Sequence, residues 1–214
     1  MATSLNLVIL GPQGSGKGTQ AKLLAEKFGI AHISTGEIFR SATADGSALG
    51  QEAKKYMDAG NLVPDDIVIG LVKEVLASPK ASNGFILDGF PRNLKQYRDM
   101  RDFWAQNGSG ELQFIFVELS EDEAVNRIAK RFICANCEEI YIGNPGVCRK
   151  CGSSELIQRT DETPEAVRQR LRLFNTETMP MVNAIEKDGE LIRVNGAPPI
   201  SEVNGEILIK LDSI

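Results

Sequence analysis

The sequence predicts an α/β fold in which a mainly parallel sheet carries helices on both faces. Short apolar runs that read as buried strands alternate with longer segments whose apolar residues recur at helical spacing. The first strand leads through a glycine-rich stretch, GPQGSGKGT at residues 11–19, into a helix. A cysteine-bearing segment in the middle of the chain follows neither period. That segment reads as an inserted lobe.

The predicted strands are short and are separated by helical segments. The first spans Ser4 to Leu10 and stops at Gly11, and a second strand lies near His32. The remaining strand-like runs cover residues 85–90, 113–119 and 191–196. Because helical segments lie between these runs, we expect parallel neighbours joined by crossover connections.

The predicted helices cover residues 17–28, 65–77, 93–106, 120–131 and 164–188. Two of them have clear start signals. Ser120 with Glu123 forms a capping box, and Thr163 followed by Pro164 places an N-cap before proline at the first helical position. We expect Pro180 to kink the last and longest helix, because proline removes a helical hydrogen bond.

The composition is that of an ordinary soluble globular protein. The chain has 214 residues, of which 42% are hydrophobic and 25% charged, with a net charge of −5. This charge argues against general binding to nucleic acids or acidic membranes. The N-terminal residues do not resemble a signal peptide, and no apolar run approaches the roughly 20 residues that span a bilayer. We therefore expect a cytoplasmic protein with reduced thiols.

The glycine-rich stretch predicts a phosphate-binding loop. Gly11, Gly16 and Lys17 match the G-x-x-x-x-G-K pattern, whereas Gly18 takes the usual hydroxyl position and Thr19 follows it. Glycines let successive backbone N–H groups surround phosphate oxygens, and the helix that begins there adds the positive end of its dipole. The alternative is a plain tight turn, but the order strand, glycines, lysine and helix favours phosphate binding.

The four cysteines of the chain form the pattern C-x₂-C-x₁₀-C-x₂-C, and they are Cys134, Cys137, Cys148 and Cys151. Four thiolates on two tight turns suit a tetrahedral Zn²⁺ ion. The alternatives are a zinc ribbon that binds nucleic acid and a pair of disulfides, and the acidic chain and reducing compartment disfavour them. A lobe of roughly 28 residues cannot bury a sufficient core, so we expect the metal to stabilise it.

Further candidate residues for phosphate chemistry lie outside the loop. In DGFPR, Asp88 follows a strand and is placed to orient Mg²⁺, while Arg92 can grip phosphate with its planar fork. A solvated turn is the alternative for that motif. Arg127 and Arg131 are four apart on the predicted helix 120–131 and would share one face.

Several segments together resemble the adenylate kinase family, in the family's order along the whole chain. They are GPQGSGKGT, ISTGEIFR, MDAGNLVPDDIV, LDGFPRNLKQ, NRIAKR and QRTDETPEAVRQRL. The resemblance implies a five-stranded parallel core made of residues 1–33, 64–130 and 160–214. It also implies an AMP-binding helical lobe at residues 34–63 and a zinc-binding lid at residues 131–159, which we call the cysteine lobe.

The resemblance also implies the roles of individual residues. The residues that would promote phosphoryl transfer are Lys17, Arg92, Arg127, Arg131, Arg159 and Arg170. Those that would bind ATP are Gly14, Ser15, Gly16, Lys17, Gly18, Thr19, Arg131, Ile140 and Tyr141. Those that would bind AMP are Thr35, Arg40, Asn61, Leu62, Val63, Gly89, Phe90, Pro91, Arg92, Gln96, Arg159 and Arg170. Asp88 would hold Mg²⁺ through water.

Two departures and two matches qualify the resemblance. Related chains with this lobe show Gly-Arg-Arg before the first cysteine, whereas here only Arg131 remains, followed by Phe132. The ten-residue gap between the cysteine pairs is short, so Ile140 and Tyr141 are assigned by position alone. Thr35 and Gln96 match the pattern that reads the adenine of AMP, while Asn93 is also found in UMP/CMP kinases.

The resemblance therefore implies reversible phosphoryl transfer from Mg-ATP to AMP, giving two ADP, by a monomer with one structural Zn²⁺. The alternatives are a kinase for CMP or UMP, and a nucleic-acid-binding zinc protein that ATP switches. Phosphoryl transfer needs alignment and charge neutralisation rather than a histidine or cysteine base. Accordingly, we expect His32, the one histidine of the chain, to be structural.

Overall fold

The structure is a computed structural model that describes residues 5–213, so the predicted strand residue Ser4 lies outside the described part. Five strands form one sheet in the order β2-β3-β1-β4-β8. Their bounds are β1 Leu5–Leu10, β2 Ala31–Ser34, β3 Gly84–Asp88, β4 Leu112–Glu118 and β8 Leu191–Asn195. All four pairings are parallel, which confirms the predicted five-stranded parallel α/β core.

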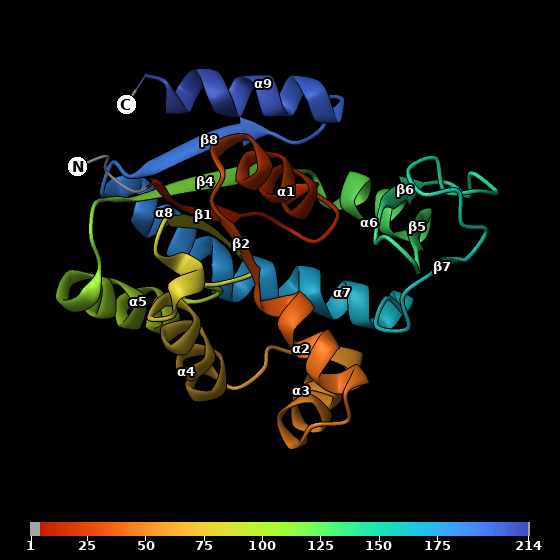
Figure 1. Ribbon diagram of the computed structural model, residues 1–214, viewed down its shortest axis with the longest axis horizontal. Coiled ribbons are helices and arrows are strands. Elements are labelled where there is room, and N and C mark those ends of the chain that lie inside the picture. Colours follow the sequence, from red (N-terminus) through yellow and green to blue (C-terminus); the bar gives the residue numbers. More distant parts are fainter. Residues whose placement is uncertain (1–4, 214) are drawn as a thin grey trace.

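Strand side chains alternate between two hydrophobic clusters, one on each face of the sheet. In β1, Leu7 and Ile9 pack on one face, while Val8 and Leu10 pack on the other. Helices α1 (Lys17–Phe28) and α9 (Ile200–Leu211) cover the first face, as Figure 1 shows. The second face is covered by α4 (Asp65–Leu76), α5 (Leu94–Asn107) and α8 (Met179–Lys187). The strands are therefore buried on both faces, as parallel sheets require.

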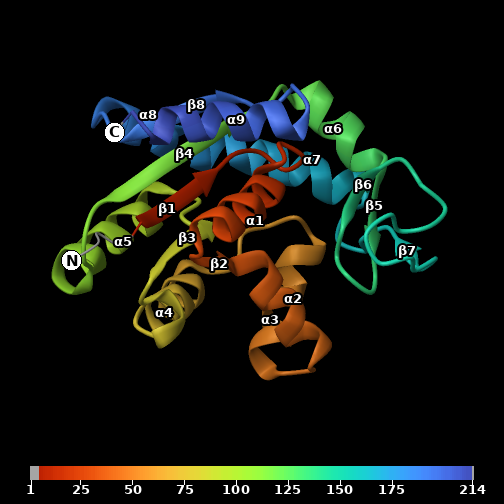
Figure 2. The same cartoon turned by 45° about the horizontal axis from the view of Figure 1, so that its top comes forward.

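Two lobes project separately from this core (Figures 1 and 2). The first is a pair of helices, α2 (Thr35–Ala44) and α3 (Ala48–Asp58), that follows the end of β2. The second is the cysteine lobe, whose antiparallel sheet has the order β6-β5-β7. Its strands are β5 Arg131–Cys134, β6 Ile140–Ile142 and β7 Leu156–Ile157. These short strands carry no periodic signal in the sequence.

The placement of Arg131 on a helix is wrong. Helix α6 (Glu121–Ala129) ends before it, and Arg131 opens β5, where it pairs with Ile142. The aromatic and β-branched residues Phe132 and Ile133 favour a strand after the helix end. Ser120 caps α6 as predicted, accepting a hydrogen bond from the Glu123 N–H at 3.3 Å. The Glu123 side chain instead accepts from Arg127 Nε at 2.8 Å, so the capping box is half formed.

The predicted helix 164–188 is present over residues 164–187, but its hydrogen-bond pattern changes in the middle. Helix α7 (Pro164–Leu173) passes through a π-helical turn at Phe174–Thr178 into α8. Pro180 follows that turn and has no N–H to donate to the carbonyl four residues earlier, and the wider turn accommodates its ring. Thr163 caps α7 as predicted. The part of the chain that the structure describes contains no helix long and apolar enough to cross a membrane.

Candidate active site

A cavity of about 690 Å³ lies where the strands of the main sheet end. Its walls include Leu10 at the end of β1, Ser34 at the end of β2 and Asp88 at the end of β3. Residues 197–200, which follow β8, also line it. The carboxyl ends of parallel strands are where open α/β sheets bind ligands.

The glycine-rich loop forms one wall of this cavity. Gly16 has a φ of 88° and stands as the N-cap of α1 without a side-chain cap, so the first N–H groups of the helix are available to an anion. Gly14 also has a left-handed φ, 87°, and a Cβ there would come within 2.9 Å of the Ala124 carbonyl oxygen in α6. Lys17 Nζ donates to the Pro12 carbonyl at 3.3 Å. Burial lowers the pKa of Lys17 to about 8, which the charge of Asp88 partly opposes.

The absent side chain at Gly18 has a structural reason. A Cβ at Gly18 would lie 3.2 Å from Asp88 Oδ2, so a hydroxyl residue there would crowd the carboxylate. Asp88 is buried, and its Oδ1 has no hydrogen-bond partner among the described residues. His32 Nε2 lies 3.8 Å from Asp88 Oδ2. Burial disfavours the ionised carboxylate, but His32 and the charge of Lys17 outweigh it, so the pKa of Asp88 lies below its usual value.

An ion-pair cluster forms a second wall. Arg159 binds Asp161 through two bonds of 2.9 and 2.7 Å, and Arg170 Nη2 donates to the same carboxylate at 2.9 Å. Arg131 Nε donates to Glu162 Oε2 at 3.0 Å. Burial disfavours ionisation of Asp161, but Arg159 and Arg170 hold its pKa well below the usual range. The guanidinium groups are thus fixed in place, since carboxylates hold them by charge-assisted bonds.

Positive charge exceeds negative charge in the cavity, although the chain as a whole is acidic. The lining includes three acidic residues, Glu37, Asp88 and Asp161, and seven basic residues, Lys17, Arg40, Arg92, Arg127, Arg131, Arg159 and Arg170. Burial, with the neighbouring charge of Arg159, lowers the pKa of Arg40 and Arg131. A polyanion bound in this cavity would relieve the repulsion among these cations.

Arg127 is engaged differently from the other arginines. Its guanidinium donates to the carbonyls of Gly196 and Ala197 at 2.9 and 2.8 Å, and to Glu123. It thereby holds the chain at Gly196 and Ala197. The cavity-lining residues 197–200 that begin there are ones that the sequence did not assign to the site. Their position directly after β8 is the signal that could have found them, because ligands bind beyond strand ends.

A small polar pocket lies at the end of the cavity nearest α5. Thr35 and Gln96 are both buried and both line the cavity. Thr35 Oγ1 donates to the Gly89 carbonyl at 3.1 Å, and Gln96 Oε1 accepts from the Arg92 N–H at 2.8 Å. Gly89 has a φ of 85°, and a Cβ there would lie 2.9 Å from Thr35 Oγ1. The backbone of Gly89 therefore packs closely against the Thr35 side chain in this pocket.

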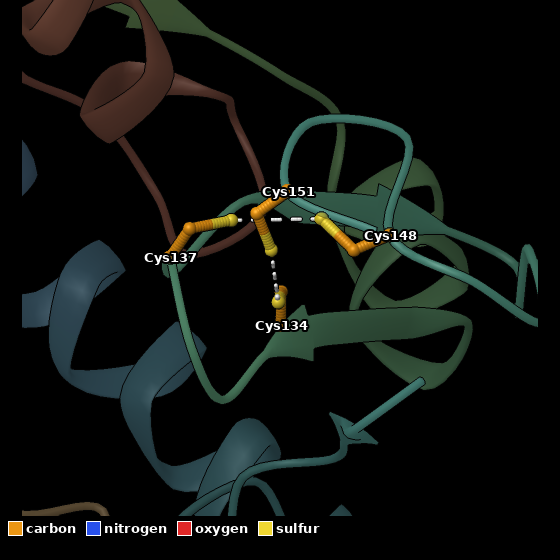
Figure 3. Close-up of side chains that lie close together, drawn as sticks. All are labelled: Cys134, Cys137, Cys148 and Cys151. Carbon is orange, nitrogen blue, oxygen red and sulfur yellow. Dashed lines mark hydrogen bonds between the residues drawn. The ribbon is translucent and has the colours of Figure 1, made fainter. Parts of the chain in front are cut away.

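The four cysteines converge in the cysteine lobe, as Figure 3 shows. Their Sγ atoms all lie within 4.8 Å of one another, and the pairs Cys134–Cys151 and Cys137–Cys148 are each 3.5 Å apart. These distances exclude disulfide bonds. A tetrahedral zinc with Zn–S bonds of about 2.3 Å places its sulfurs about 3.8 Å apart. The cluster therefore fits a four-thiolate metal site.

Most residues that the sequence assigns to the site line this one cavity. Three do not, namely Ser15, Phe90 and Tyr141. The Tyr141 hydroxyl instead lies 3.2 Å from Cys148 Sγ and accepts from the Arg149 N–H, while Ile140 and Ile142 line the cavity. Sequence reasoning also missed Asp161 and Glu162, the carboxylates that hold the arginines.

The fold and this site define a phosphate-loop protein whose cavity suits a nucleotide and a second phosphorylated ligand. A sequence profile of the family described as "Adenylate kinase" matches residues 9–190. The adenylate kinase of Archaeoglobus fulgidus is 45% identical in sequence to this chain. The match extends over 98% of this chain and 99% of that protein. Those of Oceanobacillus iheyensis and Methanothrix thermoacetophila are 42% and 41% identical over 95% of this chain. These two matches extend over 97% and 96% of the relatives' own lengths, respectively. The chain belongs to the adenylate kinase family.

Proposed function

We propose that the cavity binds ATP and AMP together and aligns their phosphates for direct transfer. Membership of the family makes the reaction the reversible transfer of a phosphoryl group from ATP to AMP, giving two ADP. The observation that carries the residue assignment is the single cavity that joins the glycine-rich loop, the arginine cluster and the Thr35–Gln96 pocket. Two ligands in one cavity can react without water between them.

The glycine-rich loop would hold the phosphates of ATP. Gly14, Gly16, Gly18 and Thr19 line the cavity around the start of α1, and Lys17 adds a charge beside them. Burial makes that charge costly in the free protein, as the lowered pKa of Lys17 indicates. Negative charge that develops during transfer compensates it, so Lys17 would stabilise the transition state more than the ground state.

The arginines would clamp the phosphates from the opposite wall. Arg159 and Arg170 share Asp161, and Arg92 Nε donates to the Gly89 carbonyl at 2.7 Å. Each guanidinium retains further N–H donors for a phosphate oxygen. Arg131, at the start of the cysteine lobe, brings one clamp from outside the core. Asn61, Leu62 and Val63 line the cavity on the side of the α2–α3 lobe, where AMP would enter.

Kinases of this family act on ATP with Mg²⁺, and Asp88 fits the ion. Its Oδ1 is buried without a partner among the described residues, and carboxylate oxygen is a preferred ligand of Mg²⁺. We propose that Asp88 holds the ion through water. The bound ion supplies charge neutralisation at the phosphates, while Asp88 orients it from the strand end.

The base of AMP would be read by Thr35 and Gln96, and the lobe that binds AMP would be residues 34–63.

We propose that the cysteine lobe, residues 131–159, binds one Zn²⁺ and closes over ATP as a rigid unit. The observation for zinc is the convergence of four Sγ atoms. We also expect a monomer, checked by size-exclusion chromatography, and a reducing cytoplasmic location, which keeps the four thiols available to metal.

A coupled assay with AMP, CMP, UMP and GMP as acceptors tests the proposal. We expect a clear preference for AMP, and we expect Thr35→Ala combined with Gln96→Asn to reduce the AMP/CMP ratio of kcat/KM. Unpaired groups cost about 1–3 kcal/mol each when the wrong base is bound. A double variant that keeps the full ratio would show that these residues do not read the base. Preference for CMP or UMP would favour a pyrimidine kinase, and transfer to none of the four would favour an ATP-switched binding protein.

A further inference from the structure

The amide of Gln96 is held between two partners of opposite kind. Its Oε1 accepts from the Arg92 backbone N–H at 2.8 Å, and its Nε2 donates to Asp65 Oδ1 at 2.7 Å. The Gln96 side chain is 1% exposed and lines the cavity. Asp65 is absent from the described residues that line the cavity, and its hydrogen bond to Gln96 links it to that lining.

These two bonds fix which way the amide points. An amide has two N–H donors and an oxygen with two acceptor positions, so one donor and one acceptor remain for a ligand. A reversed Gln96 amide would set its N–H groups against the Arg92 N–H. It would also set its oxygen against the Asp65 carboxylate, which accepts only. Both neighbours therefore enforce the same orientation.

We propose that Asp65 is a positioning residue that determines base specificity by fixing the polarity of the Gln96 amide. The remaining acceptor then meets the amino group of a 6-aminopurine, and the remaining donor meets its ring nitrogen. A 6-oxopurine presents a carbonyl and an N–H at those places, so it meets oxygen with oxygen and donor with donor. This inference rests on the proposed contact between Gln96 and the base.

Asp65 is itself well anchored for this task. It is the first residue of α4, and its Oδ1 also accepts from Asn93 Nδ2 at 2.9 Å. The Asn93 side chain caps α5 by accepting from the Gln96 N–H at 2.9 Å. Asn93, which the sequence shares with pyrimidine kinases, therefore supports Asp65 and the start of α5. The starts of two helices thus converge on the Gln96 amide.

The substitution Asp65→Asn tests the role, because an asparagine can turn its amide to donate to a reversed Gln96, which leaves the Arg92 N–H as the neighbour that still favours the original orientation. The readout is kcat/KM for AMP and for inosine monophosphate, which differ at the two base positions that Gln96 would contact. We expect the AMP/IMP ratio to fall about tenfold or more, through both loss with AMP and gain with IMP. The AMP/CMP ratio should change much less, because cytosine also presents an amino group beside a ring nitrogen acceptor.

Asp66→Asn is the matched control. It removes the same charge from the same helical turn and, like Asp65, Asp66 pairs with Lys95, but its side chain is 95% exposed. We expect it to leave the AMP/IMP ratio unchanged. If thermal unfolding shows that Asp65→Asn does not fold, Asp65→Ser provides the same comparison.

Gln96→Ala separates the positioning role of Asp65 from the contact between Gln96 and the base. Loss of AMP/IMP preference in Gln96→Ala, with full preference in the folded Asp65 variants, would overturn the positioning role and leave the base contact standing. Full preference in Gln96→Ala as well would overturn the base contact and the positioning role together. An equal fall in Asp66→Asn and Asp65→Asn would assign the effect to helix charge, and would also overturn the positioning role.

Discussion

The cavity and the cysteine lobe are held in shape by different means. The cavity sits on a sheet that is buried on both faces, and its charged side chains are fixed by carboxylates and backbone carbonyls. In residues 131–159, all of which the structure describes, only Cys134 and Cys148 are buried. Ile142 and Ile157 are 58% and 50% exposed. A large core can hold costly charges in place, whereas a small lobe with few buried residues would gain rigidity from a bound metal.

The largest effect should come from Lys17→Met in the cavity. Loss of a charge at the transferring group should lower kcat by about 10²–10³-fold or more. The Tm should stay constant or rise, because burial already lowers the Lys17 pKa to about 8 and makes its charge unfavourable for folding. Steady-state kinetics and thermal unfolding measure both. The control is Lys27→Met, which changes an exposed lysine of the same helix. Activity of Lys17→Met within threefold of the parent protein would contradict the assignment of the glycine-rich loop to phosphate binding.

The cysteine lobe should show the opposite pattern, with stability lost before chemistry. We expect one Zn²⁺ per chain by metal analysis, and Cys134→Ser should lower the Tm by roughly 5–15 °C, because metal binding contributes to folding of the lobe. The variant should keep more activity below its new Tm than Lys17→Met does. Val147→Ser, beside Cys148, is the control. Four freely titrating thiols without zinc would disprove the metal site, and chelated, folded protein that regains activity only with zinc would give the metal a catalytic role.

Asp161 should couple stability to ligand binding within the cavity. Asp161→Asn should lower the free energy of unfolding by about 2–3 kcal/mol, because Arg159 and Arg170 lose their shared carboxylate. Saturating ATP and AMP should reduce this loss, since phosphates replace the missing charge. The pKa of Asp161 is depressed on folding, so its stabilisation is present above about pH 4 and is lost as pH falls further. Urea unfolding with and without ligands, at pH 7 and below pH 4, measures these effects, and an equal loss in all conditions would contradict the coupling.

The pH dependence of activity should separate Lys17 from global unfolding. In the free protein kcat/KM for ATP should fall above pH about 8, because Lys17 loses its proton. The same titration affects the stability of the fold in the opposite direction, because folding lowers the pKa of Lys17 from 10.5. The unfolded chain binds more protons between those two values, so this group's contribution to stability rises with pH there. Lys17→Arg should lack the activity limb, and a parallel fall of activity and Tm would instead indicate unfolding.

The smallest effect should come from the ion pair between the two regions. Lys22 of α1 lies 3.7 Å from Glu138 of the cysteine lobe, but their side chains are 44% and 70% exposed. Water and salt screen such a pair, so Glu138→Gln should change stability by less than about 0.5 kcal/mol. Thermal unfolding at low and high salt measures it. A larger, salt-sensitive loss would show that the lobe is docked on α1 by charge rather than held by its cysteines.

Much of this protein is decided locally in the sequence. The strand–loop–helix order around Lys17, the N-caps Ser120 and Thr163 and the spacing of the cysteines depend on neighbours in the chain, so short-range rules find them. The parallel sheet also follows, because alternating strands and helices leave few other arrangements.

Other features depend on how side chains and short segments pack in space, and only the tertiary structure decides them. Arg131 enters the cavity from a strand because β5 pairs with β6, a contact between short segments without periodic signal. The bond from Gln96 to Asp65 spans 31 positions and sets the polarity of an amide that the sequence shows only as a glutamine. Asp161 matters because it lies between Arg159 and Arg170 in space. Residue type is local information, whereas the orientation of a side chain and its partners is fixed by packing between distant elements.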